Sequence, residues 1–337
     1  MAVALVFDFW NGYNDSASIV STMISSRALA PRAALRLTAV CEFLGPVLFG
    51  VAVATTIGAG VLRLPPGAQA LPLIVAALIA AVGWNILTSR LGIPSSSSHA
   101  LVGGLIGSAV MDGLVRHHHG MITVTDLHHA VSVIQVGGLF KVLLALLVAP
   151  LAGFVAGYLL MRVVLFVVRN STPGVNWVFK RGQILTAIGL ALSHGANDAQ
   201  KTMGIVTMAL LAAGVIPEFR VPLWVVGAAA ASIAAGTATG GWKLIKTIGG
   251  KFYKIRPVHG FTTQIGSASV ILGAALLGGP VSTSHVVSSA IMGAGSSERF
   301  NKVRWGVGKR IVATWVITIP VTCLVSALVY LLVRIFV

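Results

Sequence analysis

Long apolar stretches alternate with short polar ones along this chain, and they fall into two sets. The first set covers residues 1–26, 33–60, 71–89, 92–113 and 130–168, and the second covers 183–214, 221–242, 261–278, 280–296 and 309–336. Most of these stretches have the length, about 20 residues, of a helix that crosses the hydrocarbon core of a bilayer. The pattern predicts an all-α polytopic membrane protein with five membrane segments in each half.

Composition agrees with this class. Hydrophobic residues make up 56% of the 337 positions and charged residues only 9%, whereas a soluble domain has about 25% charged residues. The 38 glycines suit close helix packing and broken helices in lipid. The net charge of +16 resides in the short segments between apolar stretches, which favours lipid headgroups as the partner and excludes a nucleic-acid-binding face.

The distribution of positive charge predicts an orientation. If each segment crosses once, most of the 24 Lys and Arg residues lie on one side, which the positive-inside rule assigns to the cytoplasm. Both termini are then on the outer side. An odd number of crossings in each half means that the second half is inserted upside down relative to the first.

Two motifs repeat in the same order and indicate an internal duplication. Gly12-Tyr13-Asn14-Asp15 returns as Gly195-Ala196-Asn197-Asp198, and Pro94-Ser95-Ser96-Ser97-Ser98-His99 returns as Pro280-Val281-Ser282-Thr283-Ser284-His285. We therefore expect a first inverted repeat at 1–168, a cytoplasmic linker at 169–182 and a second repeat at 183–337. Inverted repeats are typical of secondary transporters, whose substrate site lies where the halves meet.

The Ser/Thr-rich clusters are candidate anion sites. Each follows a proline and precedes a short helical stretch, so we expect a re-entrant hairpin whose second helix begins partway through the membrane. Its free N–H groups, helix dipole and hydroxyls suit an anion. Caps at the membrane surface are the alternative for the serines, and buried structural histidines the alternative for the imidazoles. The candidates are Ser96, Ser97, Ser98, His99, Ser282, Thr283, Ser284 and His285.

The Asn-Asp pairs are costly in a membrane, which favours a functional role. Asn14 and Asn197 are candidate anion ligands, and Asp15 and Asp198 are suited to hold a cation or a proton, or to accept a hydrogen bond from a protonated oxyanion. The glycine before each pair indicates a helix that is interrupted or closely packed there. Capping of a broken helix is the structural alternative.

Lys201 follows Asp198 by three residues, on the same helical face, which predicts an ion pair. Its counterpart in the first half is Ser18. Lys201 either supplies a fixed positive charge where a mobile cation would otherwise bind, or forms a purely structural pair.

Other polar groups complete the predicted cation-coupling set. Glu42 and Asp8 are both candidate proton relays; the counterpart of Glu42 in the second half is Ile233, and Asp8 is expected near the membrane surface. Gln200 and Thr202 flank the second Asn-Asp pair and add polar groups. The full set is Asp15, Glu42, Asp198, Gln200, Lys201 and Thr202.

The duplicated motifs strongly resemble those of the PiT inorganic phosphate transporters. The resemblance lies in the segment from Phe7 to Asp15, the segment from Ser193 to Gly204, both Ser/Thr clusters and the segment from Gly240 to Gly249. It implies that phosphate binds between the two Asn-Asp pairs and the two clusters. Gln200-Lys201 resembles the bacterial, low-affinity, proton-driven branch, which can carry a neutral metal–phosphate complex, whereas Glu42 resembles the sodium-coupled members.

We therefore expect a symporter that imports inorganic phosphate across the bacterial inner membrane. The coupling ion is H⁺ or, as the alternative, Na⁺; the substrate is phosphate, free or as a divalent metal–phosphate complex, with a sulfate or other tetrahedral oxyanion permease as the rival. An enzyme is not expected, because Ser98 and His99 are adjacent and no Gly-x-Ser-x-Gly elbow occurs. No cofactor or resident metal is expected, and both a monomer and a homo-oligomer are open.

Overall fold

The computed structural model describes residues 1–63, 70–117, 130–251 and 255–335, and these ranges form helices without a β-strand. The first half contains α1 (Ala2–Ser25), α2 (Pro31–Phe49), α3 (Ala52–Gly60), α4 (Leu71–Leu91), α5 (Ser97–His117) and α7 (Val136–Val167). The second half contains α8 (Val175–Ala212), α9 (Leu223–Thr239), α10 (Trp242–Lys251), α11 (Pro257–Leu276), α12 (Thr283–Arg299) and α13 (Trp305–Ile335). The predicted all-α class is confirmed.

Broken helices occur at matching places in the two halves. In the described part of the chain, α4, α5, α7 and α13 are each long and apolar enough to cross a membrane. Two bent pairs pass the same test together, α2 with α3 at 76° and α9 with α10 at 71°. A glycine with positive φ stands at each bend, Gly50 at 81° and Gly240 at 70°, a conformation that glycine adopts without steric cost. The apolar stretch 33–60 is therefore bent within its length, and the stretch 221–242 ends at a bend.

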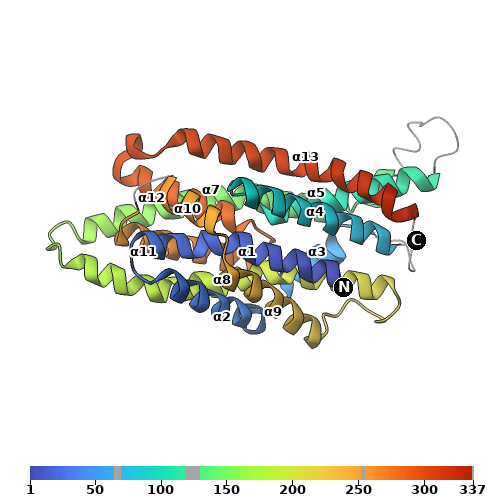
Figure 1. The fold of residues 1–337 in the computed structure, drawn as a ribbon, viewed down its shortest axis with the longest axis horizontal. Helices are drawn as coiled ribbons and strands as arrows, with labels where there is room; N and C mark the ends of the chain where they lie inside the picture. Colours follow the sequence, from blue (N-terminus) through green and yellow to red (C-terminus); the bar gives the residue numbers. More distant parts are fainter. Residues whose placement is uncertain (64–69, 118–129, 252–254, 336–337) are drawn as a thin grey trace.

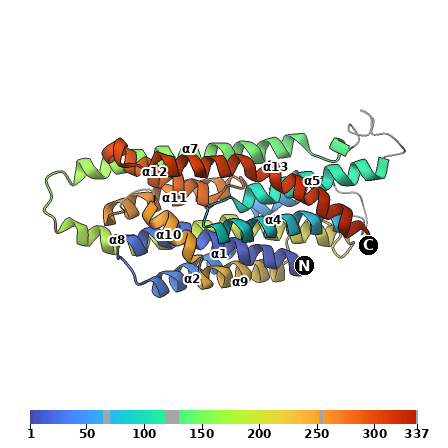
Figure 2. The same cartoon turned by 45° about the horizontal axis from the view of Figure 1, so that its top comes forward.

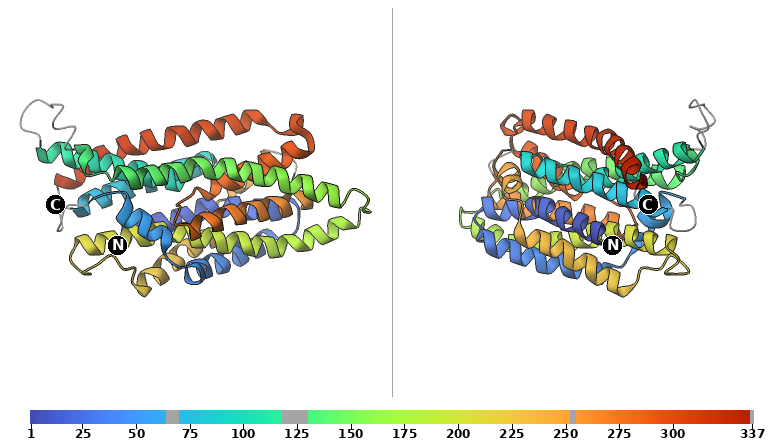
Figure 3. Two further views of the ribbon diagram at one scale, coloured as in Figure 1. Left: turned by 180° about the vertical axis from the view of Figure 1, so that it is seen from behind. Right: turned by 45° about the vertical axis from the view of Figure 1, so that its right-hand side comes forward.

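The helices form layers around a central pair. Figures 1 and 2 show α1 and α8 in the middle, with α13 on one side and α2 and α9 on the other. Both termini lie at one end, and the connection between α7 and α8 lies at the opposite end in Figures 1 and 3. Hairpin α4–α5 lies toward the end with the termini, and hairpin α11–α12 toward the other end (Figure 1). The two hairpins thus extend into the helical bundle from opposite ends.

The two halves pack through reciprocal contacts. A Cβ atom added to Gly12 of α1 would collide with the backbone of Ile233 in α9, and one added to Gly195 of α8 would collide with the backbone of Glu42 in α2. These are matching pairs in the sequence repeat, so each half places its first helix against the second helix of the other. The helices α1 and α8 run uninterrupted through the Asn-Asp pairs, so the glycines serve close packing.

Two polar parts of the sequence have defined places in the fold. Helix α8 begins at Val175, so the polar stretch 169–182 is partly helical. Asp8 is completely buried on α1, and its depth in the membrane stays a prediction. The long helices α7 and α13 lie on the outside of the helical bundle. Their exposed apolar side chains, such as Leu147, Leu151 and Leu328, suit contact with lipid.

Candidate functional site

The Ser/Thr clusters meet tip to tip in the core. Helix α5 begins at Ser97 and helix α12 at Thr283, and both tips are buried. The Ser98 hydroxyl donates to the Val281 carbonyl at 3.0 Å, and the Ser284 hydroxyl donates to the Ser95 carbonyl at 3.1 Å. The first N–H groups of a helix have no partner within it. Two helix N-termini carrying hydroxyls are therefore aimed at one region, which suits an oxyanion.

The carboxylate of Asp15 faces both tips. It accepts hydrogen bonds from the Ser284 hydroxyl at 2.5 Å, from Thr283 at 3.4 Å and from Ser97 at 3.5 Å. The donors come from α5 and α12, although Asp15 belongs to α1. Asp15 is thus the point where the first helix of the chain meets hairpin tips from both halves.

Asp198 occupies the equivalent position on α8 with different partners. The Lys201 ammonium lies 2.6 Å from its Oδ1 atom, which confirms the predicted ion pair. Thr283 donates to Asp198 at 3.2 Å and the Asn11 amide donates at 3.4 Å. Both Asp198 and Lys201 are completely buried, where a charge is stable only when it is paired.

His194 connects the carboxylates and was not singled out from the sequence. Its Nδ1 atom lies 2.7 Å from Glu42 Oε1, and its Nε2 atom lies 3.3 Å from Asp198 and 3.8 Å from Asp15. Thr237 of α9 donates a hydrogen bond to the other Glu42 oxygen. The spacing of four residues between His194 and Asp198 places both on one face of α8 and was the available signal in the sequence.

The predicted asparagines and glutamine bond to backbone groups. Asn14 donates to the Asn85 carbonyl at 3.0 Å, and Asn197 donates to the Gly279 carbonyl at 3.1 Å, so each Asn holds the hairpin of its own half. The Gln200 carbonyl oxygen accepts from the N–H groups of Val53 and Ala54 at 2.8 and 3.3 Å. Gln200 therefore caps the first turn of α3.

The two histidines of the clusters pack against each other. The ring centroids of His99 and His285 are 4.8 Å apart, and His285 stacks on Trp315 at 3.8 Å. The His99 Nδ1 atom lies 2.7 Å from the Ser96 hydroxyl. The roles of Ser96, His99 and His285 as phosphate ligands stay predictions.

Ser282 and Thr202 are the two remaining residues that the sequence predicts as ligands. Ser282 immediately precedes α12 and is buried. Thr202 is also buried. Their assignments as ligands for phosphate and for the coupling cation stay predictions.

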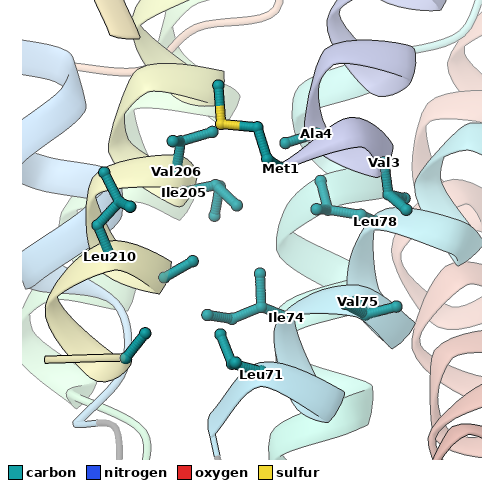
Figure 4. Close-up of a pocket in the computed structure, with 12 residues that line it drawn as sticks. Met1, Val3, Ala4, Leu71, Ile74, Val75, Leu78, Ile205, Val206 and Leu210 are labelled. Atoms are coloured by element: carbon teal, nitrogen blue, oxygen red, sulfur yellow. The ribbon is translucent and has the colours of Figure 1, made fainter. Parts of the chain in front are cut away.

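An apolar pocket of about 180 Å³ lies between α1, α4 and α8. Figure 4 shows Met1, which precedes α1, Ala4 from α1, Leu71 and Ile74 from α4, and Val206 from α8 around it. It lies toward the termini, one turn beyond Asp8 on α1 and Thr202 on α8. An anion has no partner in such a lining, so the buried polar group formed by Asp15, Glu42, His194, Asp198, Lys201 and the hairpin tips is the candidate site.

The comparisons with known proteins agree with this architecture. A model of the phosphate transporter family matches residues 11–177 and 168–326. The chain belongs to this family. It is 40% identical over 329 residues to a probable low-affinity inorganic phosphate transporter of Bacillus subtilis, covering 97% of this chain and 94% of the relative. It is also 42% identical over 332 residues to a protein of the same description from Rhizobium meliloti, covering 98% and 94%.

A solved structure described as the sodium-dependent phosphate transporter has the same fold. It matches with a TM-score of 0.85 at 25% identity and covers 100% of this chain and 98% of that chain. The resemblance inferred from the motifs is thereby confirmed, and so is the expectation that the protein is a transporter and not an enzyme. The family and the apolar helices together make the chain a multi-pass membrane protein.

Proposed function

We propose that this protein imports inorganic phosphate across the bacterial cytoplasmic membrane and that protons drive the transport. The observation that carries the proposal is the meeting of the two hydroxyl-bearing helix N-termini at Asp15, where Ser97 of α5 and Ser284 of α12 both donate, with Thr283 of α12 reaching Asp198 as well. The relatives described as inorganic phosphate transporters support the substrate. The positive end of each helix dipole and the Lys201 ammonium offset the charge of the anion.

The carboxylates favour phosphate over sulfate. At neutral pH phosphate retains at least one proton in most of its molecules, whereas sulfate has none. A phosphate hydroxyl can donate to Asp15 or Asp198, while sulfate would place only acceptor oxygens against them. Uptake of radiolabelled phosphate into proteoliposomes tests this choice. An excess of unlabelled phosphate is expected to compete with the label, whereas the same concentration of sulfate is not. Stronger competition by sulfate would contradict the proposal.

The contact between Glu42 and His194 supports proton coupling. The two side chains are completely buried and 2.7 Å apart, and His194 also faces Asp15 and Asp198. A proton that binds to or leaves one of these side chains changes the net charge beside the anion, so no other coupling ion is required. Imidazole is suited to binding and releasing a proton near neutral pH. The structural likeness to a sodium-dependent transporter leaves Na⁺ as the competing coupling ion.

An imposed gradient separates the two ions. We expect phosphate uptake into proteoliposomes to rise when the outside is acidic, to persist when choline replaces Na⁺, and to collapse on addition of a protonophore. Uptake that requires Na⁺ and is indifferent to the protonophore would contradict proton coupling while retaining phosphate as the substrate.

A second proposal concerns the form of the cargo. Asp15, His194 and Asp198 each offer one ligand atom, and these atoms lie within 4.8 Å of one another. Carboxylate oxygen and imidazole nitrogen are suitable ligands for divalent ions, which supports entry of phosphate as a neutral metal–phosphate complex. Labelled divalent ions are then expected to enter only together with phosphate, in equal amounts. Phosphate uptake unchanged by a chelator would contradict this form.

The charge distribution supports an orientation with both termini outside. Arg169, Lys180 and Arg181 flank the connection between α7 and α8, at the end opposite both termini (Figure 3). Basic residues favour the cytoplasmic side. Cysteine labelling at Ser171, which is exposed, should then succeed only after the membrane of intact cells is permeabilised.

A further inference from the structure

The ammonium of Lys201 sits among oxygen atoms from three parts of the chain. Its Nζ atom lies 2.6 Å from Asp198 Oδ1, 2.6 Å from the Ser98 hydroxyl and 2.8 Å from the Val281 carbonyl. A lysine ammonium has three N–H donors, and these three contacts use all of them. Carboxylate, hydroxyl and carbonyl oxygens are also the ligands that hard metal cations prefer.

The first half contains the counterpart of this arrangement without an amine. By the offsets of the repeated motifs, Asp15 matches Asp198, Ser284 matches Ser98, and Ser95 matches Val281. The Ser284 hydroxyl lies 2.5 Å from Asp15 Oδ1 and 3.1 Å from the Ser95 carbonyl, so the three oxygen groups converge there as well.

The counterpart of Lys201 itself is Ser18. Ser18 is completely buried. The chain therefore shows the same oxygen arrangement twice, with an ammonium in the second half and with serine at the matching sequence position of the first half.

We propose that Lys201 permanently fills a monovalent-cation site made by Asp198, Ser98 and Val281, and that replacing Lys201 by serine opens this site to Na⁺. The inference deepens the proposed function, because it assigns one of the two equivalent positions to a cation that is part of the chain. A tethered ammonium cannot leave with phosphate. That position therefore contributes constant charge and takes no part in ion movement.

Burial makes the substitution consequential. Asp198 is completely buried, and without Lys201 its carboxylate would lack its strongest partner. A small cation would restore the charge balance and the contacts with the three oxygen groups. An apolar side chain of similar length would fill the same volume without supplying charge. The two replacements therefore separate a vacated cation site from a general loss of packing.

The experiment compares Lys201→Ser with Lys201→Met and the unchanged protein. Binding of radioactive Na⁺ is measured on purified protein in detergent by scintillation proximity, with choline chloride holding the ionic strength constant. We expect Lys201→Ser to bind about one more Na⁺ per chain than the unchanged protein, and Lys201→Met to bind none in addition. In proteoliposomes, Na⁺ should raise phosphate uptake by Lys201→Ser about tenfold, within the usual range of coupling between two sites.

Each result decides the proposal. Folding is first verified by gel filtration and by thermal unfolding in the presence of Na⁺. If folded Lys201→Ser binds no additional Na⁺, or if Lys201→Met binds as much as Lys201→Ser, Lys201 is only a structural partner of Asp198 and the proposal is overturned. The binding measurement does not use phosphate. A failure of phosphate transport by the unchanged protein would therefore overturn the proposed function alone.

Should the serine variant fail to fold, Lys201→Asn serves as the second test. Its amide supplies a carbonyl oxygen to the vacated position, so additional Na⁺ binding is again expected. Absence of this binding in folded Lys201→Asn overturns the proposal in the same way.

Discussion

The two Asn-Asp pairs occupy equivalent places but have unequal surroundings. Asp15 is held by hydroxyl groups from Ser97, Thr283 and Ser284. Asp198 is held by the Lys201 ammonium and lies beside His194. The backbone framework is repeated, whereas the charged partners are not. The two pairs thus lie on helices in similar surroundings, and the residue at position 201 makes one of them an ion-paired centre.

The difference separates the two tasks that we propose for the site. The hairpin tips and their hydroxyls are common to both halves, so the proposed anion site is nearly symmetric. Glu42 and Lys201 have the apolar Ile233 and the neutral Ser18 as their counterparts, so the proposed handling of cations or protons is asymmetric. Four experiments with substituted proteins test this comparison, in order of decreasing expected effect.

Asp198→Asn should have the largest effect. It leaves the Lys201 ammonium buried without a carboxylate, and breaking a buried ion pair costs about 3–5 kcal/mol. Asp15→Asn should cost about 1–3 kcal/mol, because it weakens hydrogen bonds to hydroxyls. Thermal unfolding of both variants in detergent measures the difference. Equal destabilisation would show that the two carboxylates have equivalent partners.

Removal of one hydroxyl group from each hairpin tip should have the second-largest effect, a loss of phosphate uptake. Ser98→Ala together with Ser284→Ala deletes a donor from each half, and we expect about a hundredfold lower phosphate affinity from two hydrogen bonds to a charged group. Ser108→Ala is the matched control, because among the described residues the Ser108 hydroxyl bonds only to carbonyls of its own helix. Uptake retained by the double variant would remove these hydroxyls from the anion site.

Substitution of the two packing glycines, one in each half, should destabilise the fold by similar amounts. Gly195→Ala and Gly12→Ala each place a methyl group against the backbone of the opposite half, at an expected cost of about 1–3 kcal/mol in unfolding free energy. Gly189 of α8 faces open space, so Gly189→Ala should be neutral or slightly stabilising. A large difference between Gly12→Ala and Gly195→Ala in thermal unfolding would break the symmetry of the framework.

Glu42→Gln should produce the smallest change and a selective one. Gln retains an acceptor for Thr237 but cannot carry a proton. Uptake driven by a pH gradient is expected to fall about tenfold, and phosphate exchange without a gradient is expected to fall less. Ile233→Leu, at the matching place in the second half, should preserve both rates. Equal losses in the two assays for Glu42→Gln would assign Glu42 to packing.

Much of the fold could be predicted because lipid limits the choices. Segments of about 20 apolar residues form helices in a bilayer, since backbone groups must bond within the segment. The duplicated motifs then identified the helices that carry Asp15 and Asp198. The bends were harder to place, because a glycine such as Gly50 or Gly240 is compatible with a straight helix or a break until its neighbours are known.

The site was only partly predictable from local spacing. Lys201 could be paired with Asp198 because helical geometry brings residues three positions apart together. The contact of His194 with Glu42 joins α8 to α2, and the bond from Ser284 to Asp15 joins α12 to α1. No periodicity within one segment encodes such pairs. Gln200 likewise proved to cap α3, a partner far away in the chain.

By itself, the sequence determined the membrane class, the doubled motifs and the set of polar residues within apolar segments, whose cost in a membrane indicates a functional role. These follow from the cost of polar groups in lipid and from the period of the helix, both of which act locally. The tertiary structure decided which half contacts which, that the hairpin tips meet, and that one carboxylate receives an ammonium while the other receives hydroxyls. Those outcomes depend on packing between distant segments, where the absence of a Cβ atom at Gly12 and Gly195 permits the close approach.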